Sequence, residues 1–342
     1  MPASIRTPLI VAVALVVCMA GALAHAQGKP TPADTTKQVV AAAQAVVATL
    51  DAAGKTKVQF PFGGPQRTRW SNLPSPMFER QGLKLGDLTP PQREAVTKLL
   101  TVAFSGSGYK KVTEIMHGDE VLRQRGGGAG RGPAFGENEY YLAFVGTPST
   151  TTPWTLQFGG HHLAINLTMG GSQATLAPSH TAAQPATYTV EGRTVRPLGA
   201  ENDKAFALIN ALDATQRGQA ILNYRIADLV LGPREDGKTI QPEGAKVSTF
   251  NASQQTMLLE IVREWTGIMN DAYADARMAE IKANLPQTYF AWSGPTTAGS
   301  AAYFRIQGPT LVIEYAPQNG VDHIHTIYRD PTNDYGTKFT RK

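Results

Sequence analysis

Two short stretches of this 342-residue chain place histidines at spacings that suit a metal ion. Near the middle, residues 158–167 read FGGHHLAINL, and near the end residues 323–330 read HIHTIYRD. In an extended strand, side chains two positions apart point to the same face, so His323 and His325 are expected to point the same way. Imidazole nitrogens are good ligands for zinc, copper and iron. The second stretch therefore supplies two ligands of a candidate metal site.

The adjacent pair His161 and His162 should point to opposite faces if its strand is regular. His161 would then share a face with the apolar residues that follow, whereas His162 would share a more polar face with Asn166. His162 is therefore favoured as the ligand. The preceding Gly159 and Gly160 leave an alternative open, because glycines in a strand often mark a bulge. A bulge could aim both rings at one site.

A catalytic metal site usually takes three protein ligands and leaves one position open. His162, His323 and His325 supply that number, with His161 or the carboxylate of Glu201 in reserve. The expected cofactor is a divalent metal, either zinc, copper or iron. Two alternatives stay open: a metal- or ligand-binding protein without turnover, and a polar sheet face on which the histidines are hydrogen-bonded and free of metal.

Charged and aromatic residues near the C-terminal histidines suggest a substrate-binding region. Arg329 should lie on the histidine face and could bind an anionic group with two hydrogen bonds. An equally good interpretation is an ion pair with an aspartate that holds the last loop. Asp330 is a second catalytic candidate, whereas Arg305 and Asp334 are candidates for substrate binding. Trp292 is expected in the wall of an apolar pocket, although an aromatic residue at strand spacing also suits the core.

The motifs of several other enzyme classes are missing from the chain. The sequence contains neither G-x-S-x-G nor H-E-x-x-H, and no dinucleotide-binding fingerprint occurs. Metal-assisted chemistry is therefore the route that the available residues favour, with Glu201 or Glu314 as a general base. We expect a hydrolase on a small or anionic substrate ahead of a copper or iron oxidoreductase.

The N-terminus has the features of a secretion signal. Arg6 precedes an apolar run over residues 9–23, and residues 24–26 read AHA, which matches the A-x-A pattern of a cleavage site. We therefore expect cleavage after Ala26 and a periplasmic or extracellular protein. A lipoprotein anchored through Cys18 is disfavoured, because a bulky residue precedes the cysteine where lipoprotein signals have a small one.

Composition narrows the expected partners. The net charge is only +5, and no run of five or more basic residues occurs, so nucleic-acid binding is not indicated. Signal cleavage would remove the only cysteine, which excludes disulfide bonds and thiol catalysis in the mature chain. No second long apolar run follows, so we expect no stable membrane insertion after cleavage.

The patterning of the chain predicts a single α+β domain over residues 37–342, preceded by a solvated leader over 27–36. Strands should form a mainly antiparallel sheet, with helices flanking it. No internal repeat and no domain linker are evident. Apolar residues at helical spacing occur over residues 37–53, from 89 onward, and over 107–123, 203–222 and 252–282. Alternating stretches occur over residues 139–146, 154–171, 187–198, 288–294, 301–308, 310–317 and 323–330.

Four motifs make the chain similar to a known bacterial family. They are W-x-x-x-F-G-G-H-H-L-A-I-N at 154–166, Q-P-E-G at 241–244, Y-F-A-W-S-G at 289–294 and H-I-H-T-I-Y-R-D-P-x-N-D-Y-G at 323–336. Together they resemble the "domain of unknown function 3500" family over most of the chain. The resemblance implies no activity. It does imply that members are recognised by positions that match His161, His162, His323, His325, Arg329, Asp330 and Asp334.

Overall fold

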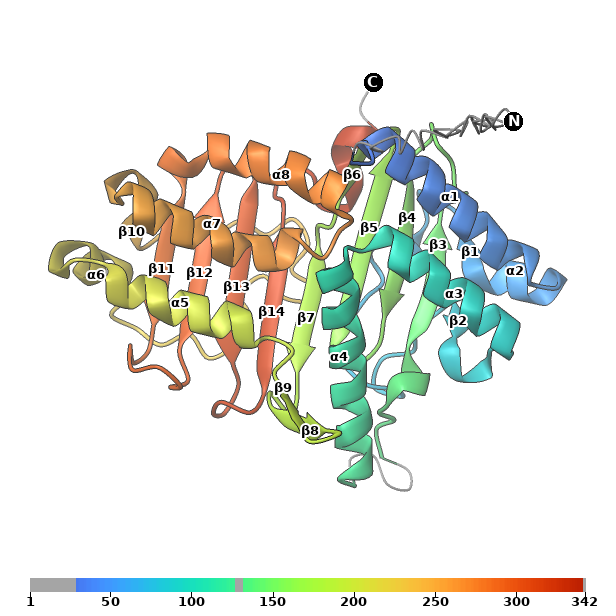
Figure 1. Ribbon diagram of the computed structural model, residues 1–342, viewed down its shortest axis with the longest axis horizontal. Coiled ribbons are helices and arrows are strands. Elements are labelled where there is room, and N and C mark those ends of the chain that lie inside the picture. Colours follow the sequence, from blue (N-terminus) through green and yellow to red (C-terminus); the bar gives the residue numbers. More distant parts are fainter. Residues whose placement is uncertain (1–28, 127–131, 341–342) are drawn as a thin grey trace, which may run out of the picture.

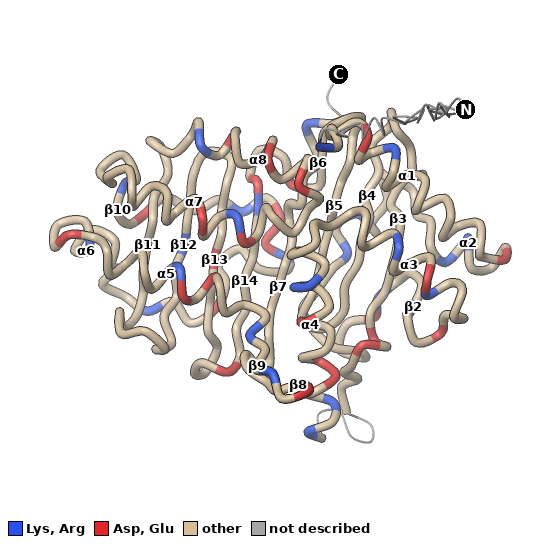
Figure 2. Tube along the Cα trace, viewed as in Figure 1, with Lys and Arg blue, Asp and Glu red and all other residues tan. Residues whose placement is uncertain are grey.

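The computed structural model describes residues 29–126 and 132–340 and is drawn in Figure 1. The secretion signal expected over residues 1–26 therefore lies outside the described residues, together with Cys18. Within the described ranges, no helix is both long and apolar enough to cross a membrane. Basic and acidic residues are interspersed along the chain in the view of Figure 2.

A single twelve-stranded sheet forms the centre of the molecule. It is antiparallel throughout, apart from the parallel pairing of β1 with β3, which confirms the expected α+β fold. The sheet order is β1 (Gln59–Phe60), β3 (Tyr141–Val145), β4 (Trp154–Gly159), β5 (Leu163–Gly170), β7 (Ser179–Ala183), β14 (Ile324–Arg329), β13 (Leu311–Pro317), β12 (Tyr303–Gly308), β11 (Tyr289–Ser293) and β10 (Ala245–Lys246). β2 (Leu83–Lys84) pairs with β3, and β6 (Gln173–Thr175) pairs with β5. β8 (Tyr188–Val190) and β9 (Arg193–Val195) form a separate hairpin.

In the described part of the chain, eight α-helices cover one face of this sheet (Figure 1). They are α1 (Pro32–Ala48), α2 (Ala52–Val58), α3 (Pro90–Ala103), α4 (Gly106–Gln124), α5 (Gly199–Ala211), α6 (Ala214–Ala220), α7 (Ala252–Thr266) and α8 (Asp271–Ala283). Short 3-10 turns lie at Pro65–Thr68, Leu85–Asp87, Glu137–Glu139, Val247–Thr249, Leu285–Gln287 and Asp334–Phe339. The central strands are buried along almost their whole length, because both of their faces are covered. Their apolar side chains form the core between sheet and helices.

Two of the expected helices are each a pair of helices, because a capping residue interrupts the apolar pattern. The stretch 203–222 is divided between α5 and α6 at Asp213, whose side chain accepts a hydrogen bond from the backbone of the new helix. The stretch 252–282 is divided between α7 and α8, where Asn270 caps the second helix. The stretch 27–36, expected as a solvated leader, is partly helical, because α1 begins at Pro32 after its N-cap residue Thr31.

The chain contains an internal repeat, which corrects the expectation that it has none. In the first half, α1, α2, β2, α3 and α4 precede the strands β3, β4, β5 and β7. In the second half, α5, α6, β10, α7 and α8 precede β11, β12, β13 and β14 in the same order. The halves join through the antiparallel pair β7–β14, and the larger strands follow in corresponding order on either side of it. Figure 1 shows two similar helix-covered half-sheets side by side.

Local details repeat between the halves as well. Gly82 and Gly244 stand before β2 and β10 with φ angles of 118° and 98°, in the region that favours glycine. A Cβ atom at either position would lie only 2.4 or 2.2 Å from a carbonyl oxygen of the neighbouring strand. α3 and α7 then begin with capping boxes at Thr89 and Asn251. The repeat is not evident in the sequence, because the two halves share backbone features and apolar positions more than they share residue identities.

Candidate metal centre

His161 and His162 lie in the tight turn that joins β4 to β5, and not within a continuous strand as expected. The backbone N–H of Gly160 donates to the carbonyl of Leu163 at 2.9 Å and closes this turn. Glycine is required beside it, since a Cβ atom at Gly159 would lie 2.3 Å from the carbonyl oxygen of Leu163. The expectation that the two rings face opposite sides is therefore wrong. The alternative holds: the glycines break the strand, and the two ring centroids lie 3.6 Å apart.

His323 and His325 also lie together, as strand alternation predicts. His325 is the second residue of β14, and His323 immediately precedes the strand. Their Nε2 atoms are 2.9 Å apart, so that one ring donates a hydrogen bond to the other. In the sheet His325 is paired with Ala316 on one side and Ala182 on the other, and these small side chains leave room for the ring.

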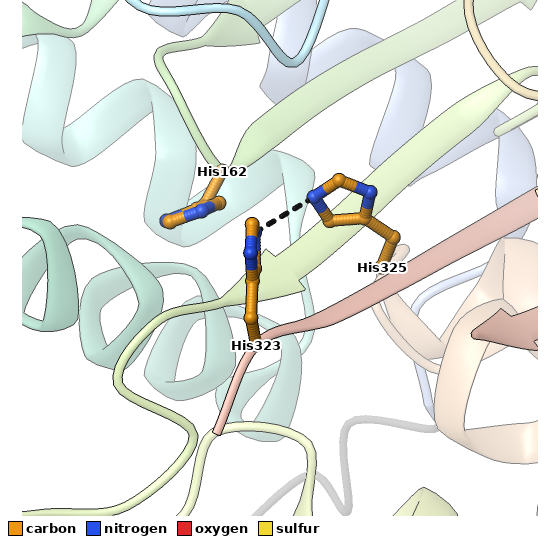
Figure 3. A group of neighbouring side chains, drawn as sticks. All are labelled: His162, His323 and His325. Atoms are coloured by element: carbon orange, nitrogen blue, oxygen red, sulfur yellow. Dashed lines mark hydrogen bonds between the residues drawn. The ribbon is translucent and has the colours of Figure 1, made fainter. Parts of the chain in front are cut away.

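His162 lies close to His323 and His325 where the central strands β5 and β14 begin (Figure 3). One ligand nitrogen from each of His162, His323 and His325 lies within 4.8 Å of the other two. The Nε2 atom of His162 is buried and has no hydrogen-bond partner among the described residues. Buried polar atoms are almost always paired, so an unpaired one at the focus of a histidine cluster points to a missing ligand. These three residues could hold a metal ion.

Asp119 of α4 supports this cluster and was missed by the sequence analysis. Its Oδ1 atom lies 2.5 Å from Nδ1 of His162 and 3.4 Å from Nδ1 of His161, and its Oδ2 atom accepts a hydrogen bond from Tyr140 at 2.8 Å. Burial alone would raise the pKa of the Asp119 carboxyl, but the two neighbouring rings hold it well below its usual range. The sequence did contain a signal, because this acid falls four residues after Ile115 on the buried side of its helix.

A second carboxylate lies behind His325. Oδ1 of Asp228 is 3.4 Å from Nδ1 of His325, on the side of the ring away from His323. A carboxylate that holds one ring nitrogen leaves the other as the metal-binding atom, and such pairs are common behind metal-bound histidines. Asp119 is hydrogen-bonded to one candidate ligand and Asp228 lies beside another, and the two carboxylates come from different halves of the chain.

His161, His323 and His325 are neutral at pH 7. Burial, helped by the neighbouring rings, lowers the pKa of His161 to about 4 and that of His323 to about 3. Burial also lowers the pKa of His325. The neutral imidazole is the form that binds metals, so no proton has to be displaced at these positions near neutral pH.

His180 of β7 extends the cluster by one more ring. Its side chain is fully buried, and its ring centroid lies 5.3 Å from that of His325. Burial lowers its pKa well below the usual value, and neither ring nitrogen has a hydrogen-bond partner among the described residues. His180 is not part of the group formed by His162, His323 and His325.

The charged residues expected around the histidines take structural roles instead. Arg329 donates to the carbonyls of Leu231 and Gly232, and pairs with Asp236 at 3.0 Å and Asp334 at 2.8 Å. Its guanidinium is therefore already occupied and does not offer a free fork to a substrate anion. Arg329 and Asp334 therefore fit the alternative interpretation: they form an ion pair with each other that holds the last loop.

Glu201 is separate from the histidines and lies in the helix layer. Its carboxylate pairs with Lys111 of α4 at 2.5 Å, which removes it from the set of candidate ligands and general bases. Glu314 is likewise saturated, since it accepts hydrogen bonds from Tyr303 and from the backbone of Val230 and Leu231. Both carboxylates were expected near a metal because sequence alone does not show which partners a buried acid finds.

The remaining expected residues are also engaged elsewhere. Asp330 lies 3.2 Å from Arg277 of α8 and accepts a hydrogen bond from Thr332. Arg305 pairs with Glu243 at 2.8 Å. Trp292 is fully buried and packs in the core, as the alternative interpretation had it. The structure thus brings together the histidines of the prediction but not its catalytic and substrate-binding residues.

Comparison with known proteins adds a family but no activity. The family described as "Protein of unknown function (DUF3500)" matches residues 32–337, a range that includes every residue of the histidine cluster and both supporting carboxylates. Neither the curated proteins nor the solved structures contain a match to this chain.

Proposed function

Because this chain belongs to the DUF3500 family, whose description assigns no activity, we propose its function from the site: an exported, metal-dependent enzyme, with hydrolysis favoured. The observation that carries the proposal is the group of three imidazoles, each with one nitrogen within 4.8 Å of the other two, together with the buried Nε2 of His162, which has no hydrogen-bond partner among the described residues. Three nitrogen ligands with one open position are typical of catalytic zinc, whereas structural zinc sites usually have four protein ligands.

The proposal assigns a separate role to each residue of the site. His162, His323 and His325 hold the ion, and Asp119 fixes the His162 ring so that Nε2 faces it. Zinc bound in this way lowers the pKa of a coordinated water and polarises a carbonyl or phosphoryl group. A cavity of about 320 Å³ lies beside His325, on the side of the ring where Asp228 is found.

A copper or iron oxidoreductase is the second candidate, because a ligand set made only of imidazoles suits these metals as well. A binding protein without turnover would use the same ligands. The identity of the bound metal and the dependence of any hydrolysis on it separate these candidates.

Export is part of the proposal. The supporting features are the apolar run and the A-x-A pattern before Gln27. Mass spectrometry of the protein recovered from the periplasm or medium of the native host should give an N-terminus at Gln27. A chain that retains residues 1–26 would contradict export by cleavage.

The metal is tested by elemental analysis of the mature protein purified without a histidine tag. We expect about one equivalent of zinc, lost from the double variant His323→Ala/His325→Ala and from His162→Ala. His117→Ala is the matched control, because this histidine of α4 pairs with Glu137 outside the cluster and should leave the zinc content unchanged. Hydrolysis of p-nitrophenyl acetate or p-nitrophenyl phosphate should fall on chelation and return with zinc.

Full metal content in the His323→Ala/His325→Ala variant would refute the site. One equivalent of copper or iron would favour the oxidoreductase. Zinc without hydrolysis of any ester would favour a binding role.

A further inference from the structure

We propose that a groove between the segment 66–81 and the sheet of the first half binds an organic anion through Arg69 and Arg80. The ligand would be a carboxylate or phosphate carried on a flat apolar group. A cavity of about 40 Å³ adjoins a second one of about 350 Å³. Both are lined by Gln66, Arg69 and Gln81, so together they form one groove. The site is separate from the candidate metal centre, whose histidines line neither cavity.

The floor of the groove is the face of the sheet that the helices do not cover. Ala143, Gln157 and Asn166 lie directly opposite one another on β3, β4 and β5, so their side chains share one face. Ala164 shares that face and packs against Trp70 in a small apolar cluster apart from the main core. The buried side chains of Gln157 and Asn166 are joined by a hydrogen bond of 3.0 Å. The floor is therefore polar but uncharged.

The lining of the groove carries two positive charges and no negative one. Arg69 and Arg80 belong to it, and none of the lining residues is an aspartate or glutamate. Neither arginine forms an ion pair with any residue of the described ranges, and the residues outside those ranges include no aspartate or glutamate. A cleft lined by charges of one sign attracts ions of the opposite sign.

Arg80 is half-buried and lacks a carboxylate in contact with it. Its Nη2 donates to the carbonyls of Ser71, Leu73 and Gly160, whereas Nε and Nη1 have no hydrogen-bond partner in the described part of the chain. Burial lowers the pKa of Arg80 to about 10. Burial acts on Arg329 in the same direction, but two carboxylates outweigh it there and raise the pKa. A bound anion would supply the opposite charge that Arg80 lacks.

Two acids act on Arg80 from a longer range, but each has another partner. Glu139 pairs with Lys84 at 2.6 Å. The carboxylate of Asp119 is hydrogen-bonded to His162. Both negative charges are therefore already engaged, and neither lines the groove.

Phe78 brings the two guanidinium groups together. The Cζ atom of Arg69 lies 5.2 Å from the centroid of this ring, and that of Arg80 lies 5.4 Å from it. Arg69 also donates to the backbone carbonyl of Glu79 at 2.8 Å. The ring attracts both cations but has no net charge, so their mutual repulsion remains. A carboxylate or phosphate that contacts both arginines would relieve this repulsion and gain charge-assisted hydrogen bonds.

Aromatic and proline side chains offer a surface for the apolar part of the ligand. Trp70, Phe78 and Tyr141 line the smaller cavity, and Phe60 and Pro65 line the larger one. Aromatic faces pack well against a flat ring. The larger cavity has the size of a small-molecule site. The groove thus suits an anion that carries a ring better than a bare inorganic ion.

The test is isothermal titration calorimetry of the mature protein with benzoate and with phenyl phosphate, and with benzyl alcohol and benzylamine as neutral and cationic analogues. We expect saturable binding of at least one anion and clearly weaker binding of both analogues. The better anion indicates which oxyanion the site takes. Arg69→Gln should weaken that binding about tenfold or more, as loss of a charge-assisted hydrogen bond does. Arg69 is chosen because it is exposed, whereas Arg80 also holds backbone carbonyls. Arg69→Lys should recover part of the affinity.

Arg225→Gln is the matched control, because this exposed arginine precedes Ile226, which contacts β11 toward the other end of the sheet. It lines neither cavity, so its loss should leave anion binding unchanged.

A second titration uses protein from which metal has been removed by chelation and dialysis. Anion binding should survive this treatment, because the groove does not use the histidines. Binding that disappears with the metal would place the anion at the metal centre and overturn this inference. Equal affinity in Arg69→Gln and the unmodified protein, equal binding of benzyl alcohol and benzoate, or no binding of either anion would overturn it as well.

Discussion

The hydrogen bond between Asp119 and His162 determines which nitrogen of the ring is available to a metal. Because the ionised carboxylate accepts a hydrogen bond from Nδ1–H, the neutral form of the His162 ring has its lone pair on Nε2, and this atom is buried without a partner among the described residues. The same carboxylate also accepts from Tyr140, which holds it in place. Asp119 of α4 therefore determines both the tautomer and the ring orientation of His162 in the β4–β5 turn.

Asp119→Asn is expected to weaken metal binding about 10- to 100-fold, the usual cost of losing a carboxylate behind a histidine ligand. The amide keeps the size of the side chain but not its charge. Competition with a chelator of known affinity measures the effect, with Asp203→Asn as a control, since Asp203 forms an exposed ion pair with Arg196. Metal affinity equal to that of the unmodified protein would show that the carboxylate only supports the fold.

From the sequence, the grouping of the histidines could be predicted but the partners of the charged residues could not, and the reason is physical. Two strand positions fix the direction of His323 and His325, so their meeting follows from local geometry. The partners of Arg329 and Glu201 come from distant segments, which only the tertiary structure brings near. A charged residue beside a candidate site is thus ambiguous until its neighbours are known.

At the scale of elements, the decisive feature is the turn between β4 and β5. The stretch 154–171 looks like one strand because both arms of the hairpin are apolar and only three residues separate them. Only glycine tolerates the close approach of the two arms at Gly159, and the turn projects both His161 and His162 beyond the sheet end. The paired glycines indicated this possibility, but sequence alone left it as one of two alternatives.

Gly159→Ala should therefore disturb the turn and the metal site together. The new Cβ atom would lie 2.3 Å from the backbone oxygen of Leu163, which can move away only if the hairpin opens. We expect a loss of about 1–3 kcal/mol in the free energy of unfolding, as overpacked sites show, and weaker zinc binding. Urea denaturation and zinc titration measure the two effects.

Gly218→Ala is the control for the added methyl group, because a Cβ atom there meets nothing within 4 Å in α6. This variant should be as stable as the unmodified protein or slightly more so, since alanine favours a helix. If Gly159→Ala behaves like the control, the glycine is not what shapes the turn.

At the scale of the whole molecule, the candidate metal site includes residues from both halves of the repeat. The first half contributes Asp119, His161 and His162, and the second contributes His323, His325 and Asp228. The corresponding turn of the second half, between β12 and β13, has Pro309 and Thr310 in place of histidines. The repeated architecture thus supplies two similar positions, and the histidine pair is present in only one of them.

A buried group of charges joins the same halves in the helix layer. Lys111 of α4 pairs with Glu201 of α5 at 2.5 Å and with Glu264 of α7 at 3.0 Å. Burial alone would lower the pKa of Lys111, but the two carboxylates outweigh it and raise the pKa above its ordinary value. The lysine therefore stays charged in the folded protein and crosses from the first half to the second.

Lys111→Met is expected to destabilise the protein by about 3–5 kcal/mol, because it leaves the charge of Glu201 buried without a partner. The double variant Lys111→Met/Glu201→Gln should recover part of this loss. Lys110→Met is the matched control, since the neighbouring lysine is exposed and pairs with Glu114 at the surface. Urea denaturation at neutral pH gives the free energies of unfolding.

The pH dependence of the same variants supplies an independent measure. Above about pH 10.4 the unfolded chain releases the lysine proton while the folded protein, with its raised pKa for Lys111, still holds it. Unfolding then becomes easier as the pH rises, and this part of the alkaline loss of stability should be absent from Lys111→Met. Identical slopes of stability against pH in the two proteins would mean that the ion pair does not join the halves energetically.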